Sequence, residues 1–515
     1  FAKKAWSDPR YVFLIGKGRE YTALRSASGL NHPQNSSFLV PTFGAPGSDH
    51  LLVASNFSVV PVIPVGRLPV ETAAEVRLYL NKVRTHEAPL GQIPADDRLW
   101  RKQVIHLGGG GSVAEQNDIR NKLSNMESVL ENSDYGASVV SFYKTSPDPI
   151  QYSQSEAISD RINSGASIVT FFGHSSSGGF DFSIDNPANY RNQNRYPLMI
   201  SLGCHSGAIH LTGKSVGELF VFQEDKGALA FIASVGLGAV SSLHAVTRQL
   251  YTEIGNEAYG KGIGDAIQRS LQVFDNTGGI FTRSLVQQYT LNGDPALVLS
   301  PSAKPDFLVN SSSPKFEPEV INAQMDSFNF HFNLLNAGRA SVDSVQVLLR
   351  RTLPGNIEFD VAKIKVPAPK YESSVVYRMP VLGKTAIGEN RFRVTVDPDN
   401  AIEETPLPVA EQNNELLSTS GEAGITQYIF DNGVSIAWPP NYAIVGQTPI
   451  KLTASTADIF ASERNYLMEI DTTEFFNSPQ VRRTTIRQKG GLVQWSPGVN
   501  WQDSTVYYWR VSPDT

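Results

Sequence analysis

The sequence predicts a mostly parallel α/β region followed by two all-β sandwich modules. Over residues 1–300, strand-sized apolar runs alternate with helical patterns. After Pro301, strand patterns continue without long helices. The chain has 515 residues, too many for one ordinary core. Alternation of strands and helices is typical of a parallel sheet with helices on both faces, whereas uninterrupted short strands are typical of sandwiches.

Each predicted element of the first region has a local signal. Strands are expected where a short apolar run ends in Gly or in polar residues: 11–16, 59–70 (extended and limited by Pro), 103–111, 138–143, 167–174, 198–204, 227–235 and 291–301. Helices are expected where apolar residues recur at helical spacing: 71–86, 112–131, 153–163, 244–258, 262–275 and 282–290. Ser112 is the expected N-cap of the second helix, and Gly165 ends the third.

The all-β part shows alternating strands in two groups. The first group is 327–336, 342–351, 374–381 and 390–398, and the second is 451–455, 465–471, 491–497 and 505–512. A polar, turn-rich stretch at 403–416 separates them. The expected domains are therefore 1–95 and 96–303, two subdomains of the α/β region, then 304–418 and 425–515. The chain begins at Phe1 and ends just after a strand pattern, so we expect a fragment of a longer, processed protein, truncated in its last module.

Composition excludes several classes of function. The net charge of -6 and a pI of about 5.9, without a Lys/Arg cluster, exclude a nucleic-acid partner. No apolar run is long enough to span a membrane. A single cysteine excludes an internal disulfide framework and Cys-rich zinc sites.

That single cysteine, Cys204, and His174 occupy equivalent places in the predicted sheet. Each follows an apolar strand, in "FFGH" and "SLGC", and each begins a turn rich in Gly and Ser. Parallel sheets bind ligands beyond the carboxyl ends of their strands, which is where both residues fall. A cysteine nucleophile needs a base to form its thiolate, and imidazole can accept that proton and return it to a leaving group. The pattern therefore suggests a catalytic dyad.

Two other interpretations of these residues stay open at the level of sequence. A lone cysteine is often only a small buried apolar residue, and a lone histidine a satisfied core residue. Alternatively, His205 and His210 could join Cys204 and His174 in a metal site, although their spacing is not a familiar zinc pattern.

Other motifs have ordinary explanations beside functional ones. "GGGGS" at 108–112 could hold a phosphate, but no G-K-[ST] follows, and a tight strand-to-helix turn is the favoured explanation for so short a pattern. The Asp-rich stretches 275–279 and 397–404 could hold a structural Ca²⁺, and turn chemistry explains both.

The ordered motifs resemble a known family. "YVFLIG", "VPVIPVGRLPV", "GHSSSGG", "GCHSG", "GALAFIAS" and "LNGDPAL" together resemble the gingipain-type cysteine peptidases, which have a caspase-like fold, over about residues 8–300. The segment "GHSSSGGFDFSIDNPANY" is most similar to the PorU-like sortases of the type IX secretion system of Bacteroidetes. The β modules resemble a cell-adhesion-related, immunoglobulin-like domain and a fibronectin-III-like domain.

The resemblance implies roles for individual residues. His174 aligns with the family's catalytic histidine and Cys204 with its nucleophile, and the oxyanion hole would be the backbone N–H groups of Cys204 and Ser175. Family members often have Gly where this chain has Ser175. No residue that orients His174 can be assigned; Asp181, Asp185 and Glu156 are the candidates. Glu218 is expected to serve the helix that follows it instead.

The implied function is a cysteine peptidase or transpeptidase that forms a thioester acyl-enzyme. It would act on protein substrates at the cell surface or outside the cell, with other surface proteins of the secretion system as partners, and it would require no cofactor. The alternative is a non-catalytic scaffold or adhesin that keeps the peptidase fold while its β modules bind partners. The substrate-specificity pocket cannot be assigned from the sequence.

Overall fold

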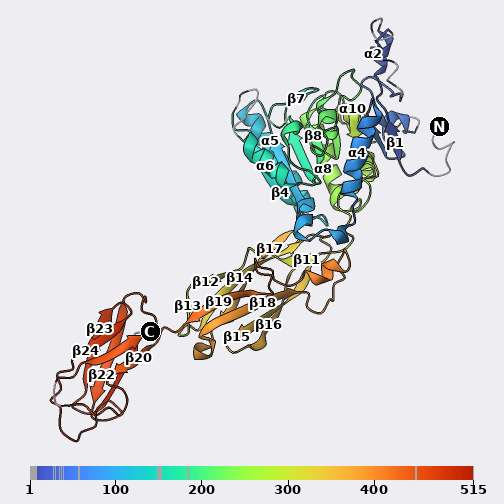
Figure 1. Ribbon diagram of the computed structural model, residues 1–515. Coiled ribbons are helices and arrows are strands. Elements are labelled where there is room, and N and C mark those ends of the chain that lie inside the picture. Colours follow the sequence, from blue (N-terminus) through green and yellow to red (C-terminus); the bar gives the residue numbers. More distant parts are fainter. Residues whose placement is uncertain are drawn as a thin grey trace.

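The computed structural model describes residues 9–513 except 27, 29–30, 34, 36–37, 39, 56–57, 147, 149–153, 183, 185, 276 and 447–448. The chain forms three regions, an α/β region followed by two β modules, and they lie end to end (Figure 1). Each has its own hydrophobic core. The predicted fold class, a mostly parallel α/β region followed by all-β modules, is confirmed.

The α/β region contains one eight-stranded sheet in the order β1-β2-β10-β9-β8-β5-β3-β4. Neighbouring strands are parallel except β9 and β10, which are antiparallel. The strands are β1 Val12–Ile15, β2 Val65–Leu68, β3 Gln103–Gly108, β4 Ser138–Tyr143, β5 Ile168–Phe172, β8 Leu198–Leu202, β9 Ala230–Ser234 and β10 Tyr289–Asn292. One continuous core reaches from Val59 to Leu299, so the two expected subdomains share a sheet and a core.

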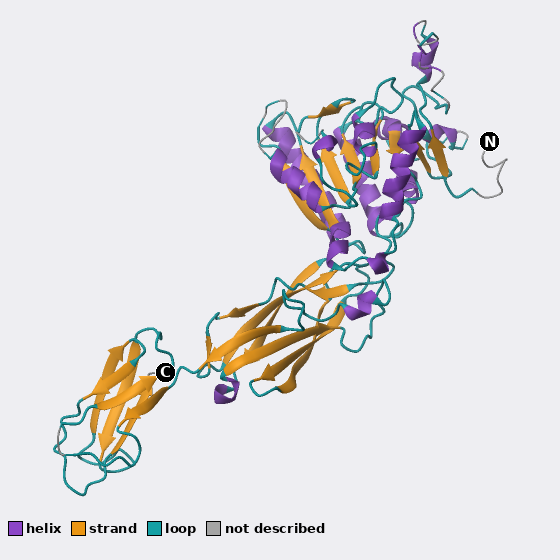
Figure 2. Ribbon diagram, viewed as in Figure 1, coloured by secondary structure: helices purple, strands orange, loops and turns teal. Residues whose placement is uncertain are grey.

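Helices cover both faces of this sheet (Figure 2). They are α4 Ala73–His86, α5 Val113–Glu131, α6 Ser155–Ser164, α7 Val216–Val221, α8 Val240–Gly255, α9 Ile263–Gln272 and α10 Ile280–Gln288. The short helix α2 Tyr21–Arg25 projects away from the sheet (Figure 1). The central strands β3, β5, β8 and β9 are buried along their whole length, as expected for apolar runs between two helical layers. No helix of the described residues is long and apolar enough to cross a membrane.

Two predicted strands of this region differ from the structure. The strand expected at 291–301 lies at β10, directly after α10, and the chain turns away at Gly293, which has a φ of 151°. Only 65–68 of the extended stretch 59–70 pairs in the sheet, because its prolines cannot donate ladder hydrogen bonds. The start expected for α6, Ser153, lies outside the described residues.

The first β module packs two sheets around an aromatic core. One sheet joins β11 Phe307–Val309, β12 Lys315–Glu317 and β17 Glu372–Pro380 to β14 Ser327–Asn336. The other has the order β13-β19-β18-β15-β16, with β13 Ile321–Asn322, β15 Ser344–Leu353, β16 Ile357–Pro367, β18 Gly388–Val396 and β19 Ile425–Phe430. We expected residues from 425 onward to belong to the last module, but β19 pairs with β18, so the first module extends to Phe430.

One buried ion pair, one buried lysine and one partly exposed ion pair join this module to the α/β region. Arg98 contacts Asp306 at 2.6 Å, and the Lys102 ammonium donates to the carbonyl of Gly338 at 2.6 Å. Arg339 reaches back to Asp134 at 2.6 Å. Arg98, Lys102 and Asp306 are buried, and buried charges are costly to leave unpaired, so their contacts favour one arrangement of the two regions.

The last module is a smaller sandwich of two three-stranded sheets. One has the order β20-β21-β24 and the other β23-β22-β25. The strands are β20 Val434–Trp438, β21 Leu452–Thr456, β22 Arg464–Asp471, β23 Arg482–Gln488, β24 Leu492–Trp495 and β25 Tyr508–Pro513.

Candidate active site

The site lies at the carboxyl edge of the sheet, where β5 and β8 end side by side. The register pairs Phe172 with Leu202, so His174 and Cys204 each stand two residues beyond paired strand ends. The Gly173 N–H donates to the Leu202 carbonyl at 3.3 Å, which extends the hydrogen bonding between the two strands by one residue. The expectation that both residues follow adjacent parallel strands is therefore confirmed.

The turn after β5 depends on a glycine. A Cβ on Gly173 would lie 2.7 Å from a carboxylate oxygen of Asp181. The chain then forms a short hairpin of β6 Ser175–Ser176 and β7 Gly179–Phe180, which leaves the imidazole of His174 64% exposed. This exposure leaves the imidazole accessible to a bound substrate.

The turn after β8 is held against that hairpin. The Ser175 hydroxyl donates to the Cys204 carbonyl at 2.8 Å, and a Cβ on Gly203 would lie only 2.1 Å from the Ser175 Oγ. The two turns are thus in direct contact, and Gly203 is required for their close approach. Cys204 itself is half-buried.

The other side of the Cys204 turn is fixed to the end of β9. The Gly238 N–H points at the Cys204 Sγ at 3.5 Å, and the His205 N–H donates to the Gly236 carbonyl at 2.9 Å. His205 has a φ of 58°, the left-handed conformation that a sharp turn needs. The Sγ also lies 3.9 Å from the Gly238 carbonyl, so this one residue contacts the sulfur through both of its backbone groups.

A third group, which the sequence did not reveal, contacts the histidine. The Nε2 of His174 lies 3.0 Å from Oε1 of Glu115. Glu115 is in the first turn of α5, where its Oε2 accepts from the Gly111 N–H at 2.8 Å and its own N–H donates to the Ser112 hydroxyl at 3.2 Å. The carboxylate is thus fixed at the helix start and can orient the imidazole.

None of the three expected partners of His174 contacts its imidazole among the described residues. Asp181 lies beneath the turn: its backbone N–H donates to the His174 carbonyl at 2.9 Å, and its carboxylate accepts from Gly110 and lies 3.5 Å from the Lys144 ammonium. Glu156 is exposed on α6, and Asp185 lies outside the described residues. The expectation was therefore wrong for Asp181 and Glu156.

The glycine loop 108–112 supports this site because two of its backbone N–H groups hold the carboxylates of Asp181 and Glu115. The Gly110 N–H is bonded to Asp181 and the Gly111 N–H to Glu115. Those are the N–H groups that a phosphate would need, and carboxylates of the protein already occupy them. A Cβ on Gly109 would lie 2.2 Å from Asp181, which explains the glycine.

The N–H of Ser175 is placed to serve as a donor. The bond from the Asp181 N–H to the His174 carbonyl makes these two residues a hydrogen-bonded pair of the hairpin. Pairs alternate along an antiparallel ladder, so the next pair, Ser175 and Phe180, is of the non-hydrogen-bonded kind. The Ser175 N–H therefore points away from its partner strand, whereas its hydroxyl is engaged with Cys204.

The histidines after Cys204 do not gather into a metal site. His210 is buried against Gly47 and near the Asp49–Arg67 ion pair, and burial lowers its pKa to about 4. His205 is exposed in its turn. Among the residues that the structure describes, no three His, Cys, Asp or Glu side chains lie together as metal ligands.

The Asp-rich stretches use their oxygens within the protein. The Asp275 carboxylate accepts from the Ser58 hydroxyl at 3.1 Å. Asp397 accepts from the N–H groups of Ala401 and Ile402, and Glu404 from the N–H of Phe307. The contacts of Asp397 are turn chemistry, whereas those of Asp275 and Glu404 join segments that are distant in the chain.

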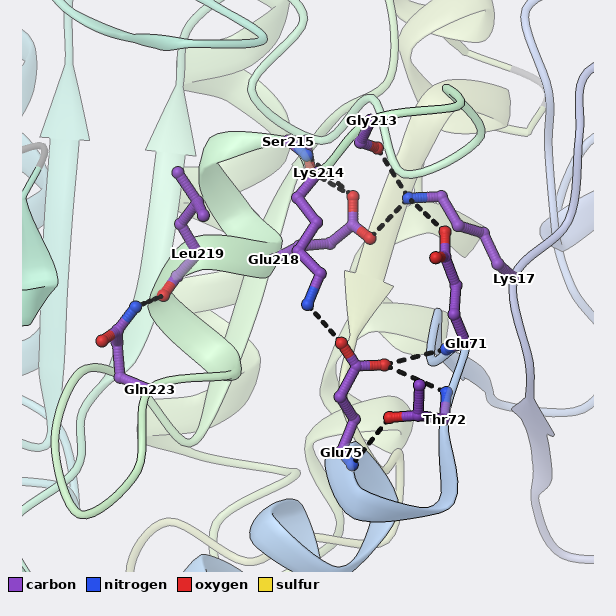
Figure 3. A network of polar contacts seen from close by, with 10 residues as sticks. All are labelled: Lys17, Glu71, Thr72, Glu75, Gly213, Lys214, Ser215, Glu218, Leu219 and Gln223. Atoms are coloured by element: carbon purple, nitrogen blue, oxygen red, sulfur yellow. Dashed lines mark hydrogen bonds and ion pairs between the residues drawn. The ribbon is translucent and has the colours of Figure 1, made fainter. Parts of the chain in front are cut away.

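A buried ion pair anchors the segment that leads from Cys204 to α7 (Figure 3). Glu218 accepts from the N–H and hydroxyl of Ser215, which confirms its expected role at the start of the helix. It also contacts the Lys17 ammonium at 2.7 Å, and Lys17 donates to the carbonyl of Gly213 at 2.7 Å. Both charged side chains are buried, and burial raises the pKa of Glu218.

This anchor extends to the hairpin beside Cys204. The Val216 N–H donates to the carbonyl of Ser177, in the turn of that hairpin, at 2.8 Å. The segment 205–215 is therefore tied at one end to β9, at the other to the hairpin, and in between to the end of β1 through Lys17.

Comparison with known proteins places the chain in a family. The model of peptidase family C25 matches residues 1–300, more than half of the chain. The chain belongs to peptidase family C25, the gingipain family of cysteine peptidases. A search of curated proteins gave no match.

Several solved structures are similar to this chain. The Arg-specific cysteine proteinase gingipain R (RGPB) is 14% identical with a TM-score of 0.47, over 83% of this chain and 85% of that one. The complex of RgpB pro- and mature domains from Porphyromonas gingivalis gives 13% and 0.46, over 83% and 87%. Dimeric latent PorU from the same organism gives 12% and 0.25, over 99% of this chain and 48% of that one.

Proposed function

We propose that this chain is a cysteine endopeptidase or transpeptidase in which Cys204 is the nucleophile and His174 the general base and acid. The observation that carries the proposal is the register of β5 and β8, which sets both residues equally far beyond paired strand ends. The contact between their turns, from Ser175 to Cys204, supports it. Glu115 acts as the positioning residue for His174.

The proposed chemistry is acyl transfer through a thioester. His174 accepts the Cys204 thiol proton as the sulfur bonds to the carbonyl carbon of the scissile peptide. The N–H groups of Ser175 and Cys204 stabilise the oxyanion. The C–N bond then breaks, and His174 gives its proton to the leaving amine. Water attacks the thioester with His174 as base, which releases the carboxylic acid and restores the thiol. No step uses a metal or a cofactor.

A transpeptidase would share the first half of this reaction. An amine would then attack the thioester in place of water and form a new amide bond. The sequence resemblance of "GHSSSGGFDFSIDNPANY" to the PorU-like branch supports this variant, with a place at the cell surface among proteins of type IX secretion. Secreted proteins would be the substrates and neighbouring surface proteins the partners.

Alkylation of the single cysteine tests the dyad. At pH 6.5 we expect iodoacetamide to modify Cys204 at least about tenfold faster in the wild type than in His174→Ala, because a nearby base contributes rate factors of about 10²–10⁴. Glu115→Gln should give an intermediate rate and an altered pH profile. Glu156→Gln, which changes an exposed carboxylate on α6, is the matched control. Mass spectrometry measures one modification, since no other cysteine exists.

Equal rates in the wild type and His174→Ala would contradict the dyad and support the non-catalytic scaffold. A peptide substrate offered together with an amine nucleophile separates the two enzymatic variants. An amide-linked product would support a transpeptidase, whereas hydrolysis alone at high amine concentration would exclude it.

A further inference from the structure

An exposed apolar surface borders the nucleophile. Leu237 follows directly from the loop at the end of β9 and is 73% exposed, and Val240 at the start of α8 is 38% exposed. Ile280 and Phe281, the first residues of α10, are 79% and 73% exposed. We call these four residues the apolar rim. Side chains of this size and exposure, gathered together, are typical of a surface that binds something.

Hydrogen bonds and close contacts set the rim beside Cys204. The Gly238 N–H points at the Cys204 Sγ at 3.5 Å, so Leu237 is one residue from a direct contact with the sulfur. The hydroxyls of Ser242 and Thr282 are 3.0 Å apart, which joins the starts of α8 and α10.

The loop that carries Leu237 is held in place on both sides. A Cβ on Gly236 would lie 2.3 Å from Oε1 of Gln288, and one on Gly238 would lie 2.7 Å from Leu243. Two closely packed glycines thus flank one exposed leucine. The His205 N–H donates to the Gly236 carbonyl at 2.9 Å and the Gly238 N–H points at the Cys204 Sγ, so backbone contacts on both sides of Leu237 hold this loop against the Cys204 turn.

Carboxylates near the nucleophile are already engaged. Four loops carry the residues of the site or contact them directly: 108–115, 173–181, 203–213 and 235–241, and the structure describes all of their residues. They contain two acidic side chains. Glu115 contacts His174 and Gly111, and Asp181 is 9% exposed and contacts Gly110 and Lys144. Within these loops, no carboxylate remains for a cationic substrate side chain.

From the rim and these engaged carboxylates, we infer that the enzyme selects an apolar side chain at the residue whose carbonyl is attacked, and that Leu237 is the main residue that selects it. The inference rests on the proposed function, since it concerns the acyl group that bonds to Cys204. Burial of an apolar side chain against Leu237 stabilises the complex, whereas a guanidinium or ammonium there would lose water without gaining a counter-ion.

Two peptidyl chloromethyl ketones test this on the full chain. They share the sequence acetyl-Ala-Ala-X and differ only in X, which is leucine or arginine. In each, the thiolate displaces chloride from the methylene carbon and forms a thioether. We expect the leucine probe to label Cys204 at least about tenfold faster, the discrimination typical of an apolar pocket.

Variants assign the selection to Leu237. Leu237→Asp should lower the leucine-to-arginine ratio of labelling rates at least about tenfold, and Leu237→Asn should lower it less, because it removes the apolar contact without adding charge. Leu80→Asp makes the same change at a leucine on α4 that is 41% exposed, and should leave the ratio unchanged. The ratio of leucine to arginine labelling rates in the wild type tests the inference even if a variant fails to fold.

The outcomes are distinguishable. If the arginine probe labels Cys204 as fast as the leucine probe or faster, this inference is overturned and the proposed function stands. If the ratio is the same in Leu237→Asp as in the wild type, Leu237 is not the selecting residue. If neither probe labels the folded chain, while the unfolded chain is alkylated normally, the proposed function fails and this inference fails with it.

Discussion

Replacement of Lys17 by methionine is expected to destabilise the α/β region by about 3–5 kcal/mol, the usual effect of removing one partner from a buried ion pair. Lys17 and Glu218 are 0% and 1% exposed and lie 2.7 Å apart. The substitution leaves the Glu218 carboxylate without its cation and the Gly213 carbonyl without its donor. Methionine keeps the length and the apolar stem of lysine, so the change is mainly one of charge.

The stability lost in Lys17→Met should increase with pH. Burial already raises the pKa of Glu218, and Lys17 opposes that rise. Without Lys17, the pKa of Glu218 in the folded state rises further above its unfolded value of about 4.3. A group with a raised folded pKa contributes stability below its unfolded pKa and loses it as pH increases. We therefore expect the destabilisation to be small near pH 4.5 and to grow toward pH 8.

Hydrogen exchange of amides in β8 and β9 is the suitable measurement. Each of the three regions has its own core, so a single unfolding curve would mix their transitions, whereas these buried strands report the α/β region. Lys214→Met is the matched control: Lys214 pairs with Glu75 in the same network but is 40% exposed (Figure 3). A surface pair of this kind should contribute no more than about 1 kcal/mol.

A double variant completes this test. Glu218→Gln in the Lys17→Met background removes the unpaired charge while keeping an acceptor for Ser215. It should restore a large part of the lost stability and abolish the pH dependence. If Lys17→Met costs no more than Lys214→Met, or if its cost is the same at pH 5 and pH 8, the argument from buried charge is refuted.

Two further predictions concern the site and the first β module. Gly203→Ala would place a Cβ 2.1 Å from the Ser175 Oγ. Alkylation of Cys204 at pH 6.5 should therefore slow toward the rate of His174→Ala, and the free energy of unfolding should fall by about 1–3 kcal/mol. An unchanged alkylation rate would show that the two turns can separate freely. Burial raises the pKa of Glu404 to about 8, so the module should be fully stabilised by this residue below about pH 4.3 and lose that stability as pH rises through 8. Hydrogen exchange of amides in β14 and β15 should show a flatter pH dependence of stability for Glu404→Gln, and identical profiles would contradict the shift.

The sequence was sufficient to predict that His174 and Cys204 lie at one edge of the sheet, but not that Glu115 joins them there. Apolar runs ending in "GH" and "GC" are sufficient to set His174 and Cys204 at the ends of parallel strands. Glu115 was missed because its role depends on strand order: β3, which leads into α5, lies beside β5. Spacing along the chain does not reveal that order. The pattern Ser112-x-x-Glu115 after a strand was the available signal, and we interpreted it only as a helix start.

Two of the strands that the sequence did not reveal share a physical cause. Strands β16 and β23 both lie at the edges of their sheets, and most of their residues are exposed or half-buried. Such strands need no continuous apolar face, so the alternation that identifies β14 and β15 is weak in them. The β19 strand was assigned to the wrong module for another reason. It follows a long polar connection, and only its pairing with β18 shows where it belongs.

Ser175 illustrates how a departure from a family pattern can be compatible with function. Where relatives often have Gly, a serine raises the question of whether the backbone needs a conformation that only glycine adopts with ease. The described non-glycine residues with positive φ include His205 but not Ser175. The residue that must lack a side chain is instead Gly203, which faces the Ser175 hydroxyl. Because that hydroxyl bonds to the Cys204 carbonyl and the N–H points away from the hairpin, serine at this position does not itself favour the scaffold over the enzyme.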